Sequence, residues 1–202
     1  LHSYGDLATK RQDAARALDE LDRHDCKLEV WTDHGTAVTN FGSDIMQGHG
    51  DEISHEAYHA DLTVGYGIKY IWRGRVTSVT GQDVPAHFGG IFHWKYPMIS
   101  GRTLFKEVIK RKLARKGNNK YAIHGPNETL RSSVLRDKSP VYEFMRCNPH
   151  WGGVSSCAHG SHIGEVLTEG MLKHLISRGG TCILYTHLGK IDNLNIPFNK
   201  TA

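Results

Sequence analysis

The chain has 202 residues, of which 39% are hydrophobic and 23% charged, so it can form a folded domain and is unlike a disordered or low-complexity chain. No apolar run approaches the roughly 20 residues of a membrane-spanning helix, so we expect no membrane span. The net charge of +4 is unevenly placed, because residues 106–120 hold seven basic side chains against one acid, Glu107. Such a stretch is typical of a solvated helix face or of a nucleic-acid patch; we favour the former and expect no nucleic-acid partner.

The first elements follow from the spacing of apolar residues. A helix is predicted over 8–24, and a short strand over 27–32 follows it. Segment 33–52 is rich in glycine and has no apolar period, which predicts a long loop. A second helix is expected over 54–66 and a strand over 68–72.

The middle of the chain continues with a strand over 76–80, after which residues 85–101 give no clear assignment. A helix is predicted over 103–116. The apolar face expected to be buried consists of Leu104, Phe105, Val108, Ile109 and Leu113. Two strands are predicted over 129–135 and 141–147, joined by a turn.

The last elements are a helix over 163–177 and a buried strand over 181–185. Alternating strands and helices favour an α/β domain built on parallel strands. We expect a single domain over 1–202, with an irregular excursion at about 84–150. In parallel α/β folds, the carboxyl ends of the strands meet on one face, where sites form.

Side chains able to do chemistry follow several predicted strands. Asp33 and His34 follow the first strand, Arg73 follows the second, and His187 follows the last. The 14 histidines favour a metal or acid–base site, because imidazole titrates near neutral pH and is the commonest metal ligand. The four cysteines contain no C-x-x-C pair, which favours a reducing, cytoplasmic compartment.

Two motifs near opposite ends of the chain resemble those of the polysaccharide deacetylase family. Leu-His-Ser-Tyr-Gly-Asp at 1–6 looks like the family's second motif, a strand end reading His-Ser/Thr-x-x-His. Segment 179–189, with Leu184-Tyr185-Thr186-His187, is similar to the last motif, in which a strand ends in Leu-x-x-His. The resemblance implies a distorted, incomplete (β/α) barrel that hydrolyses N- or O-acetyl groups on sugars.

The resemblance also implies a divalent metal, often zinc, with His2 as a ligand, and His187 as the general acid that protonates the leaving amine. Asp6 stands where the family has a second metal histidine, and a carboxylate can also bind zinc or manganese. The family's Asp pair belongs to a strand upstream of Leu1, so the chain is expected to be N-terminally incomplete.

Amide hydrolysis needs a metal to polarise the carbonyl, a base for the water and an acid for the nitrogen. His34 is a candidate ligand beside His2 and Asp6, and Asp33 is a candidate base or a carboxylate that orients a metal ligand. The candidate side chains for sugar binding are Tyr4, Asn40, Trp72 and Arg73. For the sugar-binding candidates, packing or loop capping is an equally good interpretation.

We therefore expect a metal-dependent hydrolase that removes an acetyl group from an amino sugar or polysaccharide. One alternative is a non-catalytic glycan-binding protein on the same fold. Another is a zinc peptidase, because His55-Glu56-Ala57-Tyr58-His59 matches H-E-x-x-H, whose two histidines bind zinc from one helix face. The sugar, the acyl group, the metal and the oligomeric state stay open.

Overall fold

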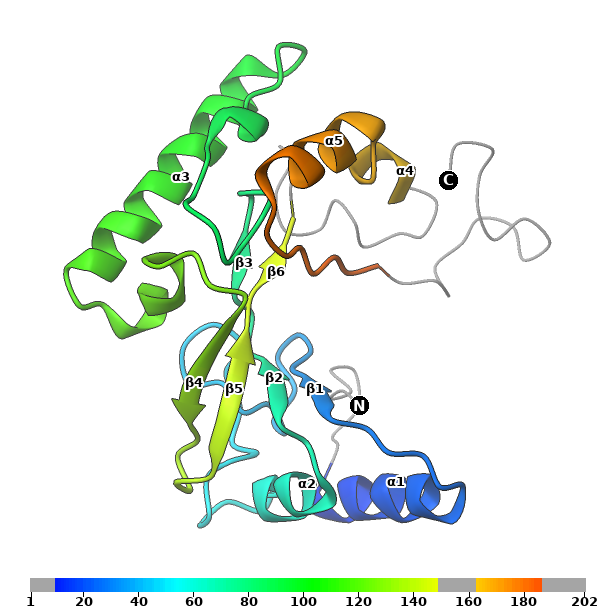
Figure 1. Ribbon diagram of the computed structural model, residues 1–202. Coiled ribbons are helices and arrows are strands. Elements are labelled where there is room, and N and C mark those ends of the chain that lie inside the picture. The colour runs from blue at the N-terminus through cyan, green and yellow to red at the C-terminus, as the bar shows by residue number, and fades with distance from the viewer. Residues whose placement is uncertain (1–9, 149–162, 187–202) are drawn as a thin grey trace. The chain divides into compact units, whose positions relative to one another are not determined.

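The computed structural model describes residues 10–148 and 163–186 and has mixed α/β structure (Figure 1). The chain divides into two compact units. The first comprises Leu1–Arg75 and Leu130–Phe144, and the second comprises Val76–Thr129 and Met145–Ala202. The expectation of a single domain over 1–202 stays a prediction.

The first unit is built on a four-stranded sheet of order β1-β2-β5-β4 (Figure 1). β1 (Val30–Thr32), β2 (Tyr70–Trp72) and β5 (Pro140–Phe144) are parallel, with Trp31 opposite Ile71 and Tyr70 opposite Tyr142. β4 (Leu130–Val134) is antiparallel to β5. The sheet is therefore mixed, the described residues show no closed barrel, and the predicted α/β barrel class stays a prediction.

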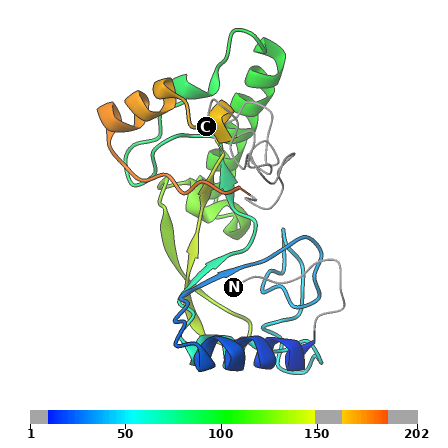
Figure 2. The ribbon, with the colours of Figure 1, turned by 90° about the vertical axis from the view of Figure 1, so that its right-hand side faces the viewer.

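Two helices, α1 (Arg11–Arg23) and α2 (Ala60–Tyr66), pack side by side in this unit (Figures 1 and 2). α1 confirms the predicted first helix and buries Ala14 and Leu18. Arg11 binds Asp61 of α2 through two hydrogen bonds of 2.6 and 2.8 Å. The apolar core beneath the helices and the loop consists of Trp31, Phe41, Ala60, Ile68, Ile71, Leu135 and Val141.

The helix predicted over 54–66 begins only at Ala60, because the preceding residues form turns against the glycine-rich loop. The backbone N–H groups of His59 and Ala60 both donate to the Gly50 carbonyl, at 2.8 and 3.0 Å. Since these bonds anchor the chain to the loop just before the helix, residues 54–58 cannot take helical hydrogen bonds. The spacing of apolar residues in the sequence gives no sign of these two hydrogen bonds.

The second unit contains a two-stranded parallel sheet of β3 (Val76–Thr77) and β6 (Arg146–Cys147). Its helical elements are α3 (Pro97–Arg115), α4 (Ile163–Val166), α5 (Glu169–Arg178) and the short 3₁₀ turns at Gly89–Ile91 and Asn119–His124. The helix predicted over 163–177 is therefore broken, and the Thr168 hydroxyl caps α5 by accepting from the Met171 N–H at 3.2 Å. The strand predicted over 181–185 is reduced to one bridge between Thr181 and Gln82.

α3 buries a different face from the one that its apolar residues predict. Phe105 is 65% exposed and Val108 47%, while Glu107 and Arg111 are buried. The cause is polar: the Glu107 carboxylate accepts from the Thr77 hydroxyl at 2.9 Å and from the Ser78 N–H at 3.2 Å. In the described part of the chain, no helix is both long and apolar enough to cross a membrane.

Candidate active site

Asp33 lies directly after β1 and is fully buried. Trp31 and Asp33 are two residues apart on an extended segment, so their side chains point to the same side. The Trp31 indole Nε1 and the Phe41 N–H both donate to Asp33 Oδ1, each at 2.9 Å. The other oxygen, Oδ2, is buried and has no hydrogen-bond partner among the described residues. The sequence therefore places at this strand end a rigidly held carboxylate with one oxygen unused.

The environment of Asp33 favours its protonated form. Burial raises the pKa of Asp33 to about 7, although the Phe41 N–H, the Trp31 indole and the charge of Arg73 oppose the rise. A carboxyl group that titrates near neutral pH can exchange a proton with a reacting group, as a general base must.

The end of β2 supplies a cluster of charges next to this carboxylate. Arg73 Nε donates to Glu143 Oε1 at 3.2 Å, and its Nη2 donates to Ser133 Oγ at 2.8 Å. Arg75 Nε contacts the same Glu143 oxygen at 3.0 Å and forms two hydrogen bonds with Asp44. Arg73 is therefore held by protein partners, and its predicted role in substrate binding fits less well than a role in fixing the sheet edge.

Two further candidates for sugar binding are used inside the protein. Trp72 is only 3% exposed, and its indole donates to the Arg75 carbonyl at 2.8 Å, so its ring offers no face for stacking on a sugar. Asn40 is fully buried; it accepts from the His34 N–H at 3.0 Å and donates to the Gly35 carbonyl at 3.3 Å. These contacts favour structural roles for both residues over the predicted contacts with substrate, and Asn40 holds the loop that follows Asp33.

The metal set cannot be assembled from described residues alone. His34 lies next to Asp33 after β1, and imidazole nitrogen and carboxylate oxygen are the donors that zinc accepts. The described ranges contain no group of three or more His, Cys, Asp or Glu able to hold a metal ion. The other predicted ligands, His2 and Asp6, lie outside them, as do the predicted acid His187 and Tyr4. Of the predicted ligands, the described residues thus supply His34 alone, whose imidazole is of a type that zinc accepts.

The geometry argues against the peptidase alternative. His59 is fully buried, with Nδ1 2.7 Å from the Thr63 hydroxyl and Nε2 2.9 Å from the Thr39 carbonyl. Burial also lowers the pKa of His59, which keeps the ring neutral. His55 stacks on His49 at 4.1 Å and precedes α2, so the two histidines of the motif do not share a helix face.

A cavity of about 360 Å³ lies in the glycine-rich loop of the first unit. It is lined by Thr36, Val38, Gly42, Ser43, Gln47, Gly48, His49 and Arg136. Gly42 lies between this cavity and the carboxylate: a Cβ there would stand 3.3 Å from Asp33 Oδ2 and 2.0 Å from the Met46 carbonyl oxygen. The absence of a side chain at Gly42 therefore keeps the wall thin beside the unused oxygen.

Arg136 is a cavity residue that the sequence analysis missed. Its Nε and its backbone N–H each donate to Asp51 at 2.9 Å, and Nη1 donates to Glu52 at 3.1 Å. The His49 ring lies 2.7 Å from Glu52, and this hydrogen bond holds the pKa of Glu52 below its usual value. Arg136 comes from the turn between β4 and β5, and no local pattern connects it with the loop 85 residues earlier.

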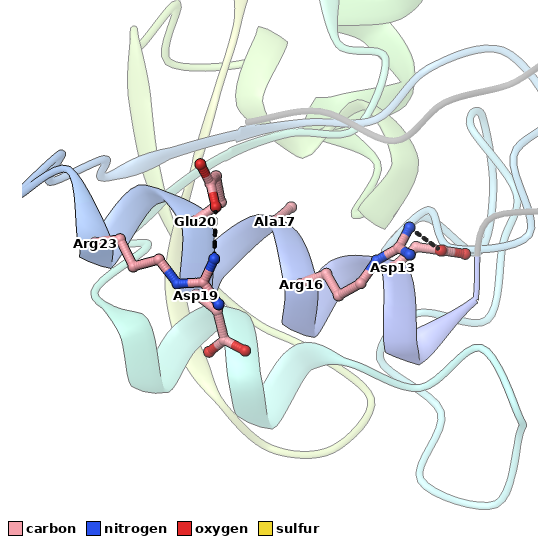
Figure 3. A pocket seen from close by; sticks show the side chains of 6 residues that line it. All are labelled: Asp13, Arg16, Ala17, Asp19, Glu20 and Arg23. Carbon is pink, nitrogen blue, oxygen red and sulfur yellow. Dashed lines mark hydrogen bonds and ion pairs between the residues drawn. The ribbon is translucent and has the colours of Figure 1, made fainter.

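A second hollow of the first unit lies on the surface of α1 (Figure 3). All six lining residues belong to that one helix, and Arg16 pairs with Asp13 at 3.2 Å and Arg23 with Glu20 at 3.1 Å. Because these charges are exposed and paired with each other, the hollow is an ordinary solvated helix face.

Comparisons with protein-family models, curated proteins and solved structures found no match for this chain.

Proposed function

We propose that the protein is a metal-dependent hydrolase that removes an acetyl group from an amino sugar or polysaccharide. One observation carries the proposal: the buried Asp33 carboxylate at the end of β1, with Oδ1 held by two donors and Oδ2 unused. A structural carboxylate normally has its buried oxygens satisfied. An oxygen left without a partner next to Gly42 in the cavity wall suits a group that acts on a bound water.

Each step of the chemistry is assigned to a residue of this chain. Asp33 Oδ2 accepts the proton of the attacking water, and the Trp31 and Phe41 donors fix the direction of the carboxylate. The resemblance of residues 179–189 implies His187 as the group that would donate a proton to the leaving nitrogen. A divalent metal, zinc in this proposal, would be held by His34 with His2 and Asp6 and would supply polarisation of the carbonyl and a more acidic water.

The cavity lining supports a carbohydrate as the ligand. Thr36, Ser43 and Gln47 offer hydroxyl and amide groups, which can both donate and accept hydrogen bonds as sugar hydroxyls require. Its volume of about 360 Å³ lies at the small end of ligand sites, which suits one sugar unit rather than a long chain segment.

The test is release of acetate from N-acetylglucosamine oligomers by the purified chain with added zinc. Asp33→Asn keeps the shape of the side chain but removes its basicity, and we expect a loss of about 10²–10⁴ in kcat. Asp19→Asn on exposed α1 is the control and should leave the rate unchanged. Acetate release by Asp33→Asn at the unaltered rate would contradict the assignment, and oligomer binding without any acetate release would favour the glycan-binding alternative.

A further inference from the structure

The second unit contains a larger cavity, of about 660 Å³, beside the carboxyl-terminal half of α3. Its apolar wall consists of Pro85, Ala86, Phe88, Val108 and Pro126. Its polar side is basic, with Arg111 and Arg115 about one helical turn apart, Lys112 next to Arg111 in the sequence, and Asn127 from outside the helix. None of these lining residues is acidic. The basic stretch that stands out in the sequence thus borders a cavity, in addition to a solvated surface.

Arg111 is the buried member of this set, at 6% exposure. Its Nη1 donates to Glu107 at 3.0 Å and its Nη2 donates to the Asn127 side chain at 2.8 Å, while its guanidinium lies 5.1 Å from the centre of the Phe88 ring. The third donor, Nε, is buried and has no hydrogen-bond partner in the described residues. A buried donor without an acceptor is destabilising, so this wall contains a hydrogen-bond donor that no described residue uses.

The charges around the cavity do not balance. Glu107 is the one acid of the stretch, and it is already bound to Lys110 at 2.7 Å as well as to Arg111. Lys112 and Arg115 are exposed and add two further positive charges to the cavity lining. Burial, together with the charge of Arg115, lowers the pKa of Arg111, against the pull of Glu107. No acid among the described residues pairs with Lys112 or Arg115, and two cations in one cavity lining match a ligand that carries two negative charges.

We infer that this cavity binds an organic phosphate monoester with a flat or apolar body. The phosphate would lie at Lys112 and Arg115, since a phosphate dianion matches their two charges and the planar guanidinium can bind two phosphate oxygens at once. The body of the ligand would lie against Phe88, Pro85 and Pro126. The volume is in the range of sites for nucleotide-sized molecules. This site is independent of the proposed deacetylase chemistry.

The test is calorimetric titration of the full chain with adenosine 5′-monophosphate, adenosine and inorganic phosphate. The nucleotide should bind about tenfold or more tightly than either part alone, because both walls of the cavity then contribute. The double variant Lys112→Gln/Arg115→Gln should weaken nucleotide binding about tenfold or more. The control Arg102→Gln/Lys106→Gln removes the same charge from exposed positions of α3 outside the cavity and should change the affinity less than about twofold.

The inference would be overturned by the absence of nucleotide binding at millimolar concentration, by adenosine binding as tightly as the nucleotide, or by equal weakening in the two double variants. A single-stranded oligonucleotide that binds more tightly than the nucleotide, with both double variants weakened alike, would instead identify a diffuse nucleic-acid patch and would also overturn it. Salt dependence in the unaltered protein gives a second measurement, since a specific phosphate contact weakens as salt rises.

Discussion

Replacement of Asp33 by Asn should change how the stability of the protein depends on pH. Burial raises the pKa of Asp33 from 3.8 to about 7, so the folded protein keeps this proton up to about pH 7, whereas the unfolded chain loses it above about pH 4. The contribution of Asp33 to stability is therefore greatest below pH 4, falls as the pH rises towards 7 and then levels off. Each unit of pKa difference corresponds to about 1.4 kcal/mol, which gives about 4 kcal/mol in all and about 2.5 kcal/mol between pH 5 and pH 8.

The Asn side chain carries no charge at any of these pH values, so Asp33→Asn removes this term. Urea unfolding of both proteins at pH 5, 6, 7 and 8, with a chelator present, measures it as the difference between the two free energies of unfolding. Other titrating groups, such as His59, are common to both proteins and cancel in the difference. The gain of the variant over the natural protein should grow by about 2.5 kcal/mol from pH 5 to pH 8.

The difference in free energy of unfolding also has a part that does not depend on pH, because the new Asn amide places a donor where Oδ2 had no partner. The pH-dependent part does not depend on that constant part. A difference that stays constant across pH 5–8 would refute the view that Asp33 holds a proton in the folded state. A growing gain in stability, with loss of acetate release, is the pattern expected of a functional carboxylate that is destabilising where it stands.

Three further predictions follow from the packing and charges. Gly42→Ala places a Cβ 2.0 Å from the Met46 carbonyl oxygen and should destabilise the protein by about 1–3 kcal/mol in thermal unfolding. Gly65→Ala in α2 has open space around it and should stabilise the protein by about 0.5–1 kcal/mol. Equal effects of the two substitutions would contradict the close packing at Gly42. Arg136→Gln leaves the buried Asp51 without its cation and should cost about 3–5 kcal/mol, against less than about 0.5 kcal/mol for the exposed Arg16→Gln; a small loss at Arg136 would show that Asp51 needs no partner. Although burial opposes it, Lys110 and the hydrogen bonds lower the pKa of Glu107, so the stabilisation by this carboxylate is present above about pH 4.5 and is lost as the pH falls further. Glu107→Gln should therefore have a lower free energy of unfolding than the natural protein at pH 7, and the difference should narrow towards pH 3. A difference that does not change with pH would count against a charged Glu107 in the folded protein.

Local patterns predicted much of the first unit. The helix α1, the strands β1, β2 and β5 and the glycine-rich loop all lie where apolar spacing and turn residues placed them. Asp33 was predicted as a site residue from its position at a strand end, because the direction of parallel strands decides which loops share an edge of the sheet. That rule needs only the order of the elements, and order can be read from a sequence.

The orientation of α3 could not be read in the same way. Its apolar residues suggested one buried face, yet the structure buries Glu107 and Arg111, whose partners Thr77 and Asn127 come from distant segments. Likewise, the anchoring of residues 59 and 60 on Gly50 delays the start of α2 and separates the histidines of the zinc-like motif. Spacing describes what a helix could bury, whereas polar contacts from elsewhere decide what it does bury.

The burial, the pKa and the hydrogen-bond partners of each candidate residue also depended on the tertiary structure. The sequence by itself determined which residue types stand at the strand ends and in the basic stretch of α3. Only the three-dimensional structure decided that Trp72 and Asn40 are consumed in packing, that one Asp33 oxygen is left unused, and that Arg111, Lys112 and Arg115 border a cavity. Burial, pKa and hydrogen-bond supply depend on atoms brought together from far along the chain, and no local pattern encodes them.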